Sequence, residues 1–221
     1  MILGIYGASG LGTEYELLAE RINEAKHCWE QIVFVDDTPA KIGTTLVGLP
    51  IIGFDSAIST YGMDGIEFII AIGEPAGKDA VFQKLTKTGA NITSLIHPDV
   101  IPVKSFQHGK GLVIHKNSGM PPCSVYGNNV LVQGTAITGH DLTVGDNVVI
   151  SSLSFIGGNV TIGKNTYIGP SSCIRNGIKI GQNVIVGMGA VVTKDVPDNA
   201  VVYGNPAKIM RYNDSGRVFS K

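Results

Sequence analysis

Hydrophobic positions recur every six residues through most of the second half of the chain. From Ile114 to Val192, fourteen consecutive sixth positions are apolar, except for Thr138, which is small and β-branched. The next residue is glycine in eight of these hexads, and the residue four positions beyond the apolar one is often small or β-branched. A period of six fits neither a helix of 3.6 residues per turn nor the alternation of a strand.

This period predicts a left-handed parallel β-helix. Each hexad supplies one short strand and one turn, three hexads complete a triangular coil, and the stacked coils bury a continuous core together. Residues eighteen apart are expected to stack, as with Val144, Ile162 and Ile180. We place this domain at residues 96–212, including a cap from residue 195 that covers the edge of the last coil. Residues 213–221 are predicted to be a polar, frayed tail.

The first half of the chain alternates strand-like and helix-like segments instead. Apolar strands are predicted at Ile2–Tyr6, 32–35 and 66–72, and helical spacing is found at residues 13–26 and 78–88. Such alternation is typical of a small parallel sheet flanked by helices. We therefore predict an α/β, Rossmann-like domain over residues 1–95.

A glycine-rich turn with the sequence Gly-Ala-Ser-Gly-Leu-Gly, at residues 7–12, connects the first strand to the first helix. Backbone N–H groups and the helix dipole receive phosphate in this context. The glycine spacing is not G-x-G-x-x-G, so dinucleotide binding is a weak inference. Asp36 ends the second strand, where it would meet ribose in a dinucleotide-binding domain, and Gly73 ends the next strand and would line the same crevice.

Composition narrows the range of partners. The net charge of −1 gives no clustered basic surface for nucleic acid. No apolar run approaches the roughly 20 residues of a membrane span, and no secretory leader is recognised, so we expect a cytoplasmic protein that does not bind membranes. The cysteines, Cys28, Cys123 and Cys173, have no metal-ligand spacing and are expected to be free thiols.

The candidate catalytic residue is His140, the only one of five histidines inside a well-formed hexad. Its position is at or near a coil corner, where a side chain can point outward toward a neighbouring subunit. A neutral imidazole can take a proton from an attacking amine or hydroxyl, and the adjacent Asp141 can hold one tautomer. Gly158, one coil further on, would let a backbone N–H approach an oxyanion. A polar turn residue and a turn glycine are the alternative interpretations.

The hexads followed by Val-Val-Tyr-Gly-Asn-Pro-Ala-Lys, at residues 201–208, resemble the hexapeptide-repeat acyltransferases. Together with the glycine-rich turn and residues 34–37, nearly the whole chain resembles the family of sialic-acid O-acetyltransferases and nucleotide-sugar N-acetyltransferases. The resemblance implies acetyl-CoA as co-substrate and a homotrimer of side-by-side β-helices with acetyl-CoA in the groove between neighbours. It also implies that the N-terminal domain holds the nucleotide of the acceptor.

The resemblance assigns roles to particular residues. His140 and Asp141 match the family's histidine–acid pair, and Gly158 matches the glycine whose amide meets the thioester oxygen. Walls and phosphate partners of CoA are expected at Gly187, Gly189, Lys208 and Arg211, although solvated cap charges are an equal alternative. The nucleotide sugar is expected at Gly7, Ser9, Gly10, Gly12, Asp36, Asp37 and Gly73. Many relatives have histidine where this chain has Leu11, which bears on the identity of the acceptor.

The predicted function is acetyl-CoA-dependent N-acetylation of a UDP- or dTDP-linked 4-amino-4,6-dideoxy sugar in surface-glycan (O-antigen) biosynthesis. O-acetylation of sialic acid or another sugar is the alternative within this class. A zinc lyase resembling the γ-carbonic anhydrases needs three imidazoles, so the single histidine of the regular hexads disfavours it and no metal is expected. A non-catalytic nucleotide-sensing module remains open on the sequence alone.

Overall fold

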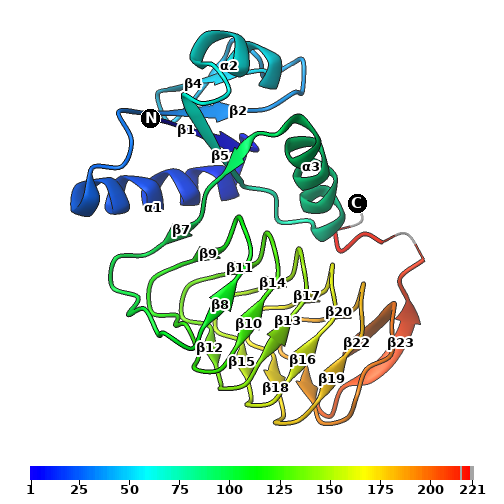
Figure 1. Cartoon of the computed structure of the whole chain (residues 1–221). Coiled ribbons are helices and arrows are strands. Elements are labelled where there is room, and N and C mark those ends of the chain that lie inside the picture. Colours follow the sequence, from blue (N-terminus) through cyan, green and yellow to red (C-terminus); the bar gives the residue numbers. More distant parts are fainter. Residues whose placement is uncertain (215, 220–221) are drawn as a thin grey trace.

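The computed structural model describes residues 1–214 and 216–219 of the chain. Its N-terminal domain contains a six-stranded sheet in the order β3-β4-β2-β1-β5-β6, parallel except for the β3–β4 hairpin. Helix α1 covers one face of this sheet, while α2 and α3 cover the other (Figure 1). The elements are β1 (Ile2–Tyr6), α1 (Gly10–Lys26), β2 (Gln31–Val35), β3 (Thr45–Leu46), β4 (Leu49–Ile52), α2 (Phe54–Tyr61), β5 (Ile66–Ile70), α3 (Pro75–Thr88) and β6 (Asn91–Ile92).

The observed elements extend the sequence prediction in three places. Helix α1 begins at Gly10, before the hydrophobic spacing starts, because Ser9 has the extended backbone of an N-cap residue. Helix α3 begins at Pro75, whose fixed φ suits the first helical turn. The segment predicted only as turn-rich contains α2 and the β3–β4 hairpin, which are too short to show a clear period.

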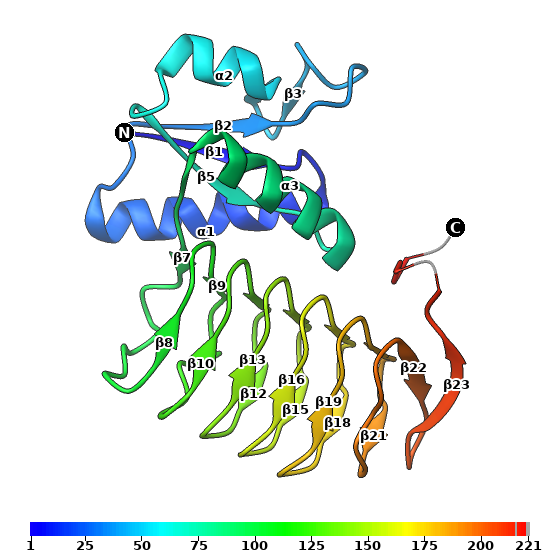
Figure 2. The same cartoon turned by 45° about the vertical axis from the view of Figure 1, so that its right-hand side comes forward.

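The second domain is a parallel β-helix with three sheets, as predicted (Figures 1 and 2). Val144, Ile162 and Ile180 pair in register, which confirms the eighteen-residue coil. The β10 sheet consists of β8 (Gln107–His108), β10 (Val125–Tyr126), β13 (Thr143–Val144), β16 (Thr161–Ile162) and β19 (Lys179–Ile180). The β11 sheet consists of β7 (Leu95–Ile96), β9 (Val113–Ile114), β11 (Leu131–Val132), β14 (Val149–Ile150), β17 (Tyr167–Ile168), β20 (Ile185–Val186), β22 (Ala200–Tyr203) and β23 (Lys208–Tyr212). The β12 sheet consists of β12 (Ile137–Thr138), β15 (Phe155–Ile156), β18 (Cys173–Ile174) and β21 (Val191–Val192).

The coil corners explain the residues that flank each apolar position. The glycine after it lies against the next coil, since a Cβ on Gly145 would be 2.6 Å from the backbone nitrogen of Lys164. Two residues later the backbone is left-handed, with φ of 59° at Asn147 and 57° at Asn165. Asparagine tolerates this conformation better than most residues. In these hexads, glycine therefore permits close stacking of the coils, and asparagine accommodates the left-handed turn.

Two strands of the β-helix, β7 and β8, precede the hexad pattern, and one hexad lacks a strand. Strand β8 precedes Ile114 in the stack, and the inward position beside it is taken by the buried Phe106. Met120 packs against the core but lies outside every named strand. Pro121 and Pro122 follow it and cannot donate ladder hydrogen bonds.

The N-terminal domain rests on the β11 sheet. The outward residues Leu131 and Val149 of this sheet share a buried cluster with Leu18 of α1 and with Leu3 and Ile5 of β1. Figure 2 shows α1 between the six-stranded sheet of the N-terminal domain and the β-helix. Strand β7 pairs with β9, so the chain enters the β-helix at the interface between the two domains.

An asparagine ladder at the corner between the β10 and β11 sheets fixes α3 to the β-helix. The Asn129 amide donates to Asn147 Oδ1 at 2.9 Å and to the carbonyl of Lys78 at 3.2 Å. The Asn147 amide donates to Asn165 Oδ1 and to Asp79 Oδ1, both at 3.0 Å. The buried ladder thus crosses the domain boundary.

Replacing Asn147 by alanine is expected to lower the free energy of unfolding by about 1–3 kcal/mol, because it removes the three hydrogen bonds that join Asn147 to Asn129, Asn165 and Asp79. The matched control is Asn183→Ala, which has the same left-handed backbone but an exposed hydrogen bond to Asn199. Urea denaturation of both variants measures the difference. Equal losses in the two variants would attribute the effect to backbone strain alone.

The C-terminal segment closes the solenoid and then returns to the N-terminal domain. Strand β22 continues the stack on β20, and β23 turns back antiparallel to it, over the predicted cap. Beyond the cap, the backbone N–H groups of Val218 and Phe219 donate to the Glu74 carboxylate at 2.9 and 3.1 Å. The predicted frayed tail therefore makes defined contacts at these two residues, while residues 215, 220 and 221 lie outside the described part. No helix among the described residues is long and apolar enough to cross a membrane.

Candidate active site

His140 lies at the corner that follows β12, where the coil turns from the β12 sheet into the β10 sheet. Its side chain is exposed, and its Nδ1 lies 2.5 Å from Asp141 Oδ2. An ionised carboxylate only accepts hydrogen bonds, so Nδ1 is the donor in this pair, and in a neutral ring Nε2 is then the nitrogen with the free lone pair. The left-handed backbone of Asp141, with φ of 55°, belongs to the repeated corner geometry. The solenoid turn itself thus holds the pair together.

Gly158 lies directly against the His140 ring, one coil away. Pairing of Thr138 with Ile156 aligns the two corners, and a Cβ on Gly158 would lie only 2.8 Å from His140 Nε2. The N–H groups at the equivalent corner positions of Asn128 and Gln182 donate to aspartate side chains. Among the described residues, the Gly158 N–H has no such acceptor. A hydrogen-bond donor and a proton acceptor therefore adjoin each other at this corner.

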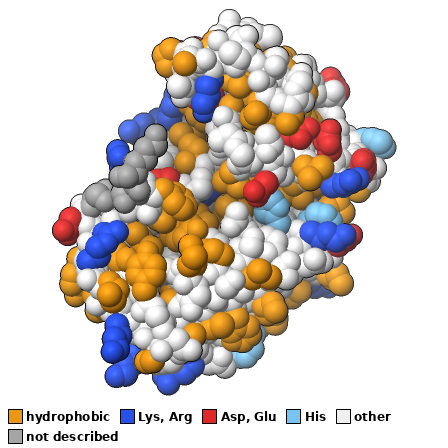
Figure 3. Space-filling view, turned by 180° about the vertical axis from the view of Figure 1, so that it is seen from behind, with side chains coloured by type: hydrophobic (Ala, Val, Ile, Leu, Met, Phe, Trp, Pro, Cys, Tyr) orange, Lys and Arg blue, Asp and Glu red, His pale blue; other side chains and the backbone are white. Residues whose placement is uncertain are grey.

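The β12 sheet next to this corner has an apolar outer face. Ile137 and Phe155 point outward and are 58% and 44% exposed, and Cys173 is exposed in the same column. The outward positions of the β10 sheet are mostly polar, with Gln107, Thr143, Thr161 and Lys179, and the exposed Val125 is the apolar exception. Hydrophobic side chains also cover much of the β-helix half of the molecule seen from behind (Figure 3).

The residues expected to bind CoA lie apart from His140 within one chain. Gly187 and Gly189 occupy the corner before β21, across the β12 sheet from the His140 corner. The Tyr203 ring covers Gly187, where an added Cβ would lie 1.9 Å from Tyr203 Cε1, whereas Gly189 is open. Both basic residues of the expected set, Lys208 and Arg211, are exposed on β23.

A cavity of about 370 Å³ lies at the carboxyl ends of β1, β2 and β5. Four of the predicted nucleotide-sugar residues line it, namely Gly7, Ser9, Asp36 and Gly73. Sequence reasoning did not select the other lining residues that carry functional side chains, which are Tyr6, Thr38, Lys41, Glu74 and Phe219.

Asp36 organises this cavity through a set of hydrogen bonds. Its carboxylate accepts from the Ala8 and Thr38 N–H groups, both at 3.0 Å, and from Lys41 Nζ at 2.7 Å. Burial raises the pKa of the carboxyl, but the hydrogen bonds from Lys41, Thr38 and Ala8 outweigh it and bring the pKa to about 2. Asp36 is therefore ionised at neutral pH. Its partner is the Lys41 ammonium group, which was not predicted from the sequence.

Asp37 has a different environment from Asp36. It accepts hydrogen bonds from the Tyr6 hydroxyl, from Lys84 Nζ at 2.5 Å and from the Phe54 N–H at 2.9 Å. Burial raises the pKa of this carboxyl. The hydrogen bonds from Lys84 and Tyr6 have the larger combined effect, so the pKa is lowered overall. Asp37 thus ties α2 and α3 to the sheet and does not line the cavity.

The remaining glycines of the turn also lie outside the cavity lining. A Cβ on Gly12 would lie 2.3 Å from the Gly7 carbonyl oxygen, so this glycine permits close packing of α1 on β1. Gly10 has open space around it. Leu11 packs near the cavity, with its Cδ2 3.8 Å from the position of a Cβ on Gly73.

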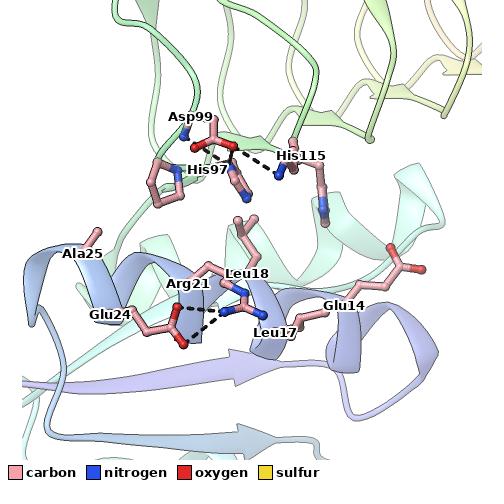
Figure 4. Close-up of a pocket in the computed structure, with 11 residues that line it drawn as sticks. Glu14, Leu17, Leu18, Arg21, Glu24, Ala25, His97, Asp99 and His115 are labelled. Carbon is pink, nitrogen blue, oxygen red and sulfur yellow. Dashed lines mark hydrogen bonds and ion pairs between the residues drawn. The ribbon is translucent and has the colours of Figure 1, made fainter.

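A larger cavity, about 680 Å³, lies between α1 and the first coils (Figure 4). His97 and His115 face Glu14 and Arg21 of α1 across it. Burial, with a smaller contribution from His97, lowers the pKa of His115 to about 4. His115 is therefore neutral near pH 7. This cavity combines no thiol, hydroxyl nucleophile or glycine amide with its histidines. Within the described residues, no group of three His, Cys, Asp or Glu side chains is placed to hold a metal ion.

Comparisons with known proteins agree with the two-domain organisation. A family model described as the PglD N-terminal domain matches residues 3–85, and one described as the hexapeptide repeat of succinyl-transferase matches residues 159–194. No curated protein matches the sequence significantly.

Solved structures match over nearly the whole chain. The acetyltransferase domain of PglB from Neisseria gonorrhoeae FA1090 is 30% identical, with a TM-score of 0.86 over 95% of this chain and 99% of that one; it is also solved in complex with acetyl coenzyme A. WeeI from Acinetobacter baumannii AYE is 30% identical, with a TM-score of 0.75 over 95% and 100% of the two chains. PerB from Caulobacter crescentus, in complex with CoA and GDP-perosamine, is 25% identical, with a TM-score of 0.84 over 96% and 98%.

Proposed function

This chain belongs to the PglD-like family of nucleotide-sugar N-acetyltransferases, and we propose that it transfers an acetyl group from acetyl-CoA to the amino group of a nucleotide-linked 4-amino-4,6-dideoxy sugar. The PglB domain in complex with acetyl coenzyme A and PerB in complex with GDP-perosamine support both substrates. The product would serve surface-glycan biosynthesis in the cytoplasm, where acetyl-CoA is available.

The observation that carries this proposal is the His140–Asp141 pair beside the Gly158 amide. His140 Nε2 takes a proton from the sugar amine as its nitrogen attacks the thioester carbonyl. The Gly158 N–H donates to the oxyanion that forms, and Asp141 stabilises the imidazolium. When the carbon–sulfur bond breaks, the imidazolium returns the proton to the CoA thiolate, which leaves as the thiol.

A homotrimer would complete the site. In one chain the His140 corner faces solvent and is bordered by the apolar outer face of the β12 sheet, including Ile137 and Phe155. A second chain packed on this face would remove the apolar surface from water and supply the other wall of a groove for acetyl-CoA. Gly187, Gly189, Lys208 and Arg211 are proposed to contact CoA from that neighbouring surface, with the two basic residues near its phosphates.

The cavity at the ends of β1, β2 and β5 is proposed to hold the nucleotide sugar. Gly7 and Ser9 precede the first turn of α1, whose N–H groups and dipole favour phosphate. The Asp36–Lys41 pair would contact the nucleoside part of the acceptor. Asp37 would contribute indirectly, because its hydrogen bond holds the Tyr6 side chain that lines the same cavity. Gly10 and Gly12 are proposed to shape the turn.

An acceptor panel tests the proposed function. Acetyl transfer is followed as CoA thiol release with UDP-, dTDP- and GDP-linked 4-amino-4,6-dideoxy sugars, with the matching 4-hydroxy nucleotide sugars, and with sialic acid. We expect turnover with at least one amino sugar and none with its hydroxy counterpart. Turnover with sialic acid alone would replace the proposal by O-acetylation, and no thiol release with any acceptor would favour a non-catalytic binding module.

A further inference from the structure

The last described residues of the chain cover the nucleotide-sugar cavity. The two carboxylate oxygens of Glu74 accept one hydrogen bond each, from the Val218 N–H at 2.9 Å and from the Phe219 N–H at 3.1 Å. These contacts join residues more than 140 positions apart in the sequence. Glu74 follows Gly73 at the end of β5 and is the N-cap residue of α3. The contact therefore fixes the tail at the rim of the cavity.

Phe219 belongs to the lining of this cavity, together with Ser9, Asp36 and Gly73. Its ring makes an edge contact with Tyr167 of β17, with the ring centroids 5.4 Å apart and the planes at 80°. The side chain is nevertheless 59% exposed. Among the described residues, its ring contact is with the β-helix, and more than half of its surface is exposed.

The position of Tyr167 indicates which part of an occupant would meet Phe219. Asp36 and Lys41 lie at the carboxyl end of β2, within the N-terminal domain, whereas Tyr167 is on the outer face of the β-helix. The groove proposed for the acetyl donor is bordered by the Gly187 corner, where the β11 sheet that carries Tyr167 turns into the β12 sheet, so the sugar end of the acceptor is expected to point toward the β11 sheet. Phe219 therefore lies at the sugar end of the cavity.

The negative charge of Glu74 lies at the rim of the cavity, where it could oppose binding of a nucleotide sugar. The Glu74 carboxylate without a partner would repel a diphosphate, but here both of its oxygens are engaged by backbone N–H groups. Because the donors are backbone groups, the latch does not depend on the side chain of residue 218. The aromatic ring that the latch presents is specific to residue 219.

We propose that Glu74 latches the C-terminal tail over the cavity and that Phe219 packs against the deoxy-sugar ring of the acceptor as a substrate-positioning residue. This inference rests on the proposed function. A 4,6-dideoxy sugar has a methyl group and an apolar face, which an aromatic ring contacts by dispersion and by removal from water. Glu74 acts through the tail.

Steady-state kinetics with the acceptor that the wild-type enzyme prefers test the role of Phe219. Phe219→Ala is expected to raise KM for the nucleotide sugar by about tenfold, the loss of one good apolar contact, with KM for acetyl-CoA unchanged. Phe219→Tyr should restore the wild-type value, and Val218→Ala, which keeps both backbone donors, is the matched control. An unchanged KM for the nucleotide sugar in Phe219→Ala, or an equal rise of both KM values, would overturn the proposal.

Limited trypsin digestion tests the latch without any substrate. Cleavage after Arg217 releases residues 218–221, and mass spectrometry measures its rate. Glu74→Ala is expected to accelerate this cleavage several-fold relative to cleavage after Arg211, and an unchanged ratio would rule out the latch. If wild-type enzyme acetylates no nucleotide sugar, the proposed function fails, whereas the digestion still decides whether Glu74 holds the tail.

Discussion

Replacement of His140 by alanine is expected to lower kcat by about 10²–10⁴-fold, the range that a positioned general base contributes. The dissociation constant of acetyl-CoA should stay within about twofold of the wild-type value, because the imidazole acts on the acceptor's proton and not on the donor's binding surface. Thiol release measures the first quantity, and isothermal titration calorimetry measures the second.

His108→Ala is the matched control for this variant. His108 is also an exposed histidine of the β-helix, but its Nδ1 lies 2.7 Å from the Gly109 carbonyl oxygen, and no carboxylate among the described residues holds its tautomer. Its replacement should leave kcat unchanged. Wild-type turnover in His140→Ala, or an equal loss in both variants, would contradict a general-base role for His140.

The second large effect is expected from Gly158→Ala, which should lower kcat by about 10²–10³-fold, the loss typical of an oxyanion-hole donor. An added methyl group would lie 2.8 Å from His140 Nε2 and 2.9 Å from its Cε1. The exposed ring must therefore swing outward, which separates the proton acceptor from the backbone N–H. Because the ring can move into solvent, the thermal midpoint should fall by only a few degrees.

Gly119→Ala is the control for this substitution. Gly119 is also a β-helix glycine, but a Cβ there meets nothing within 4 Å. This variant should keep wild-type kinetics. If Gly158→Ala lowers the thermal midpoint strongly or retains full kcat, Gly158 is a packing glycine and not part of the reaction site.

The solenoid could be predicted in detail because its determinants are local and repeated. Ile162 and Ile180 point inward for the same reason, a fixed spacing that places each at the same point of the coil. The same spacing brought His140 and Gly158 together. The period predicted a strand at Met120 that is absent, because prolines interrupt the hydrogen-bonding pattern there, and it gave no signal for elements as short as α2.

The cavity proposed for the nucleotide sugar was only partly predictable, because its side chains come from segments without a common period. Lys41 reaches Asp36 from an irregular stretch, and Phe219 reaches Glu74 from the opposite end of the chain. The sequence predicted a common role for Asp36 and Asp37, as an acidic pair that contacts the nucleotide sugar. In the fold, Asp36 bonds Ala8 and Lys41 beside the cavity, and Asp37 bonds the N-terminus of α2. The positions of the neighbouring strands and helices determine which role each aspartate has. Two adjacent aspartates in a sequence do not indicate these positions.

The eighteen-residue coil also imposes a frame on how this protein can change in length. Insertion of a single residue into one of the strands between Val144 and Ile162 would turn the rest of that strand's inward side chains out of the core. A whole additional coil would preserve the inward positions, since each coil already contacts only its neighbours. A change in length that is not a whole coil is absorbed at a turn, as in the last coil, where Ile185 pairs with Val201 only sixteen residues later. Whole coils therefore set the length of the strand stack between the His140 corner and the C-terminal cap, and turns absorb the remainder.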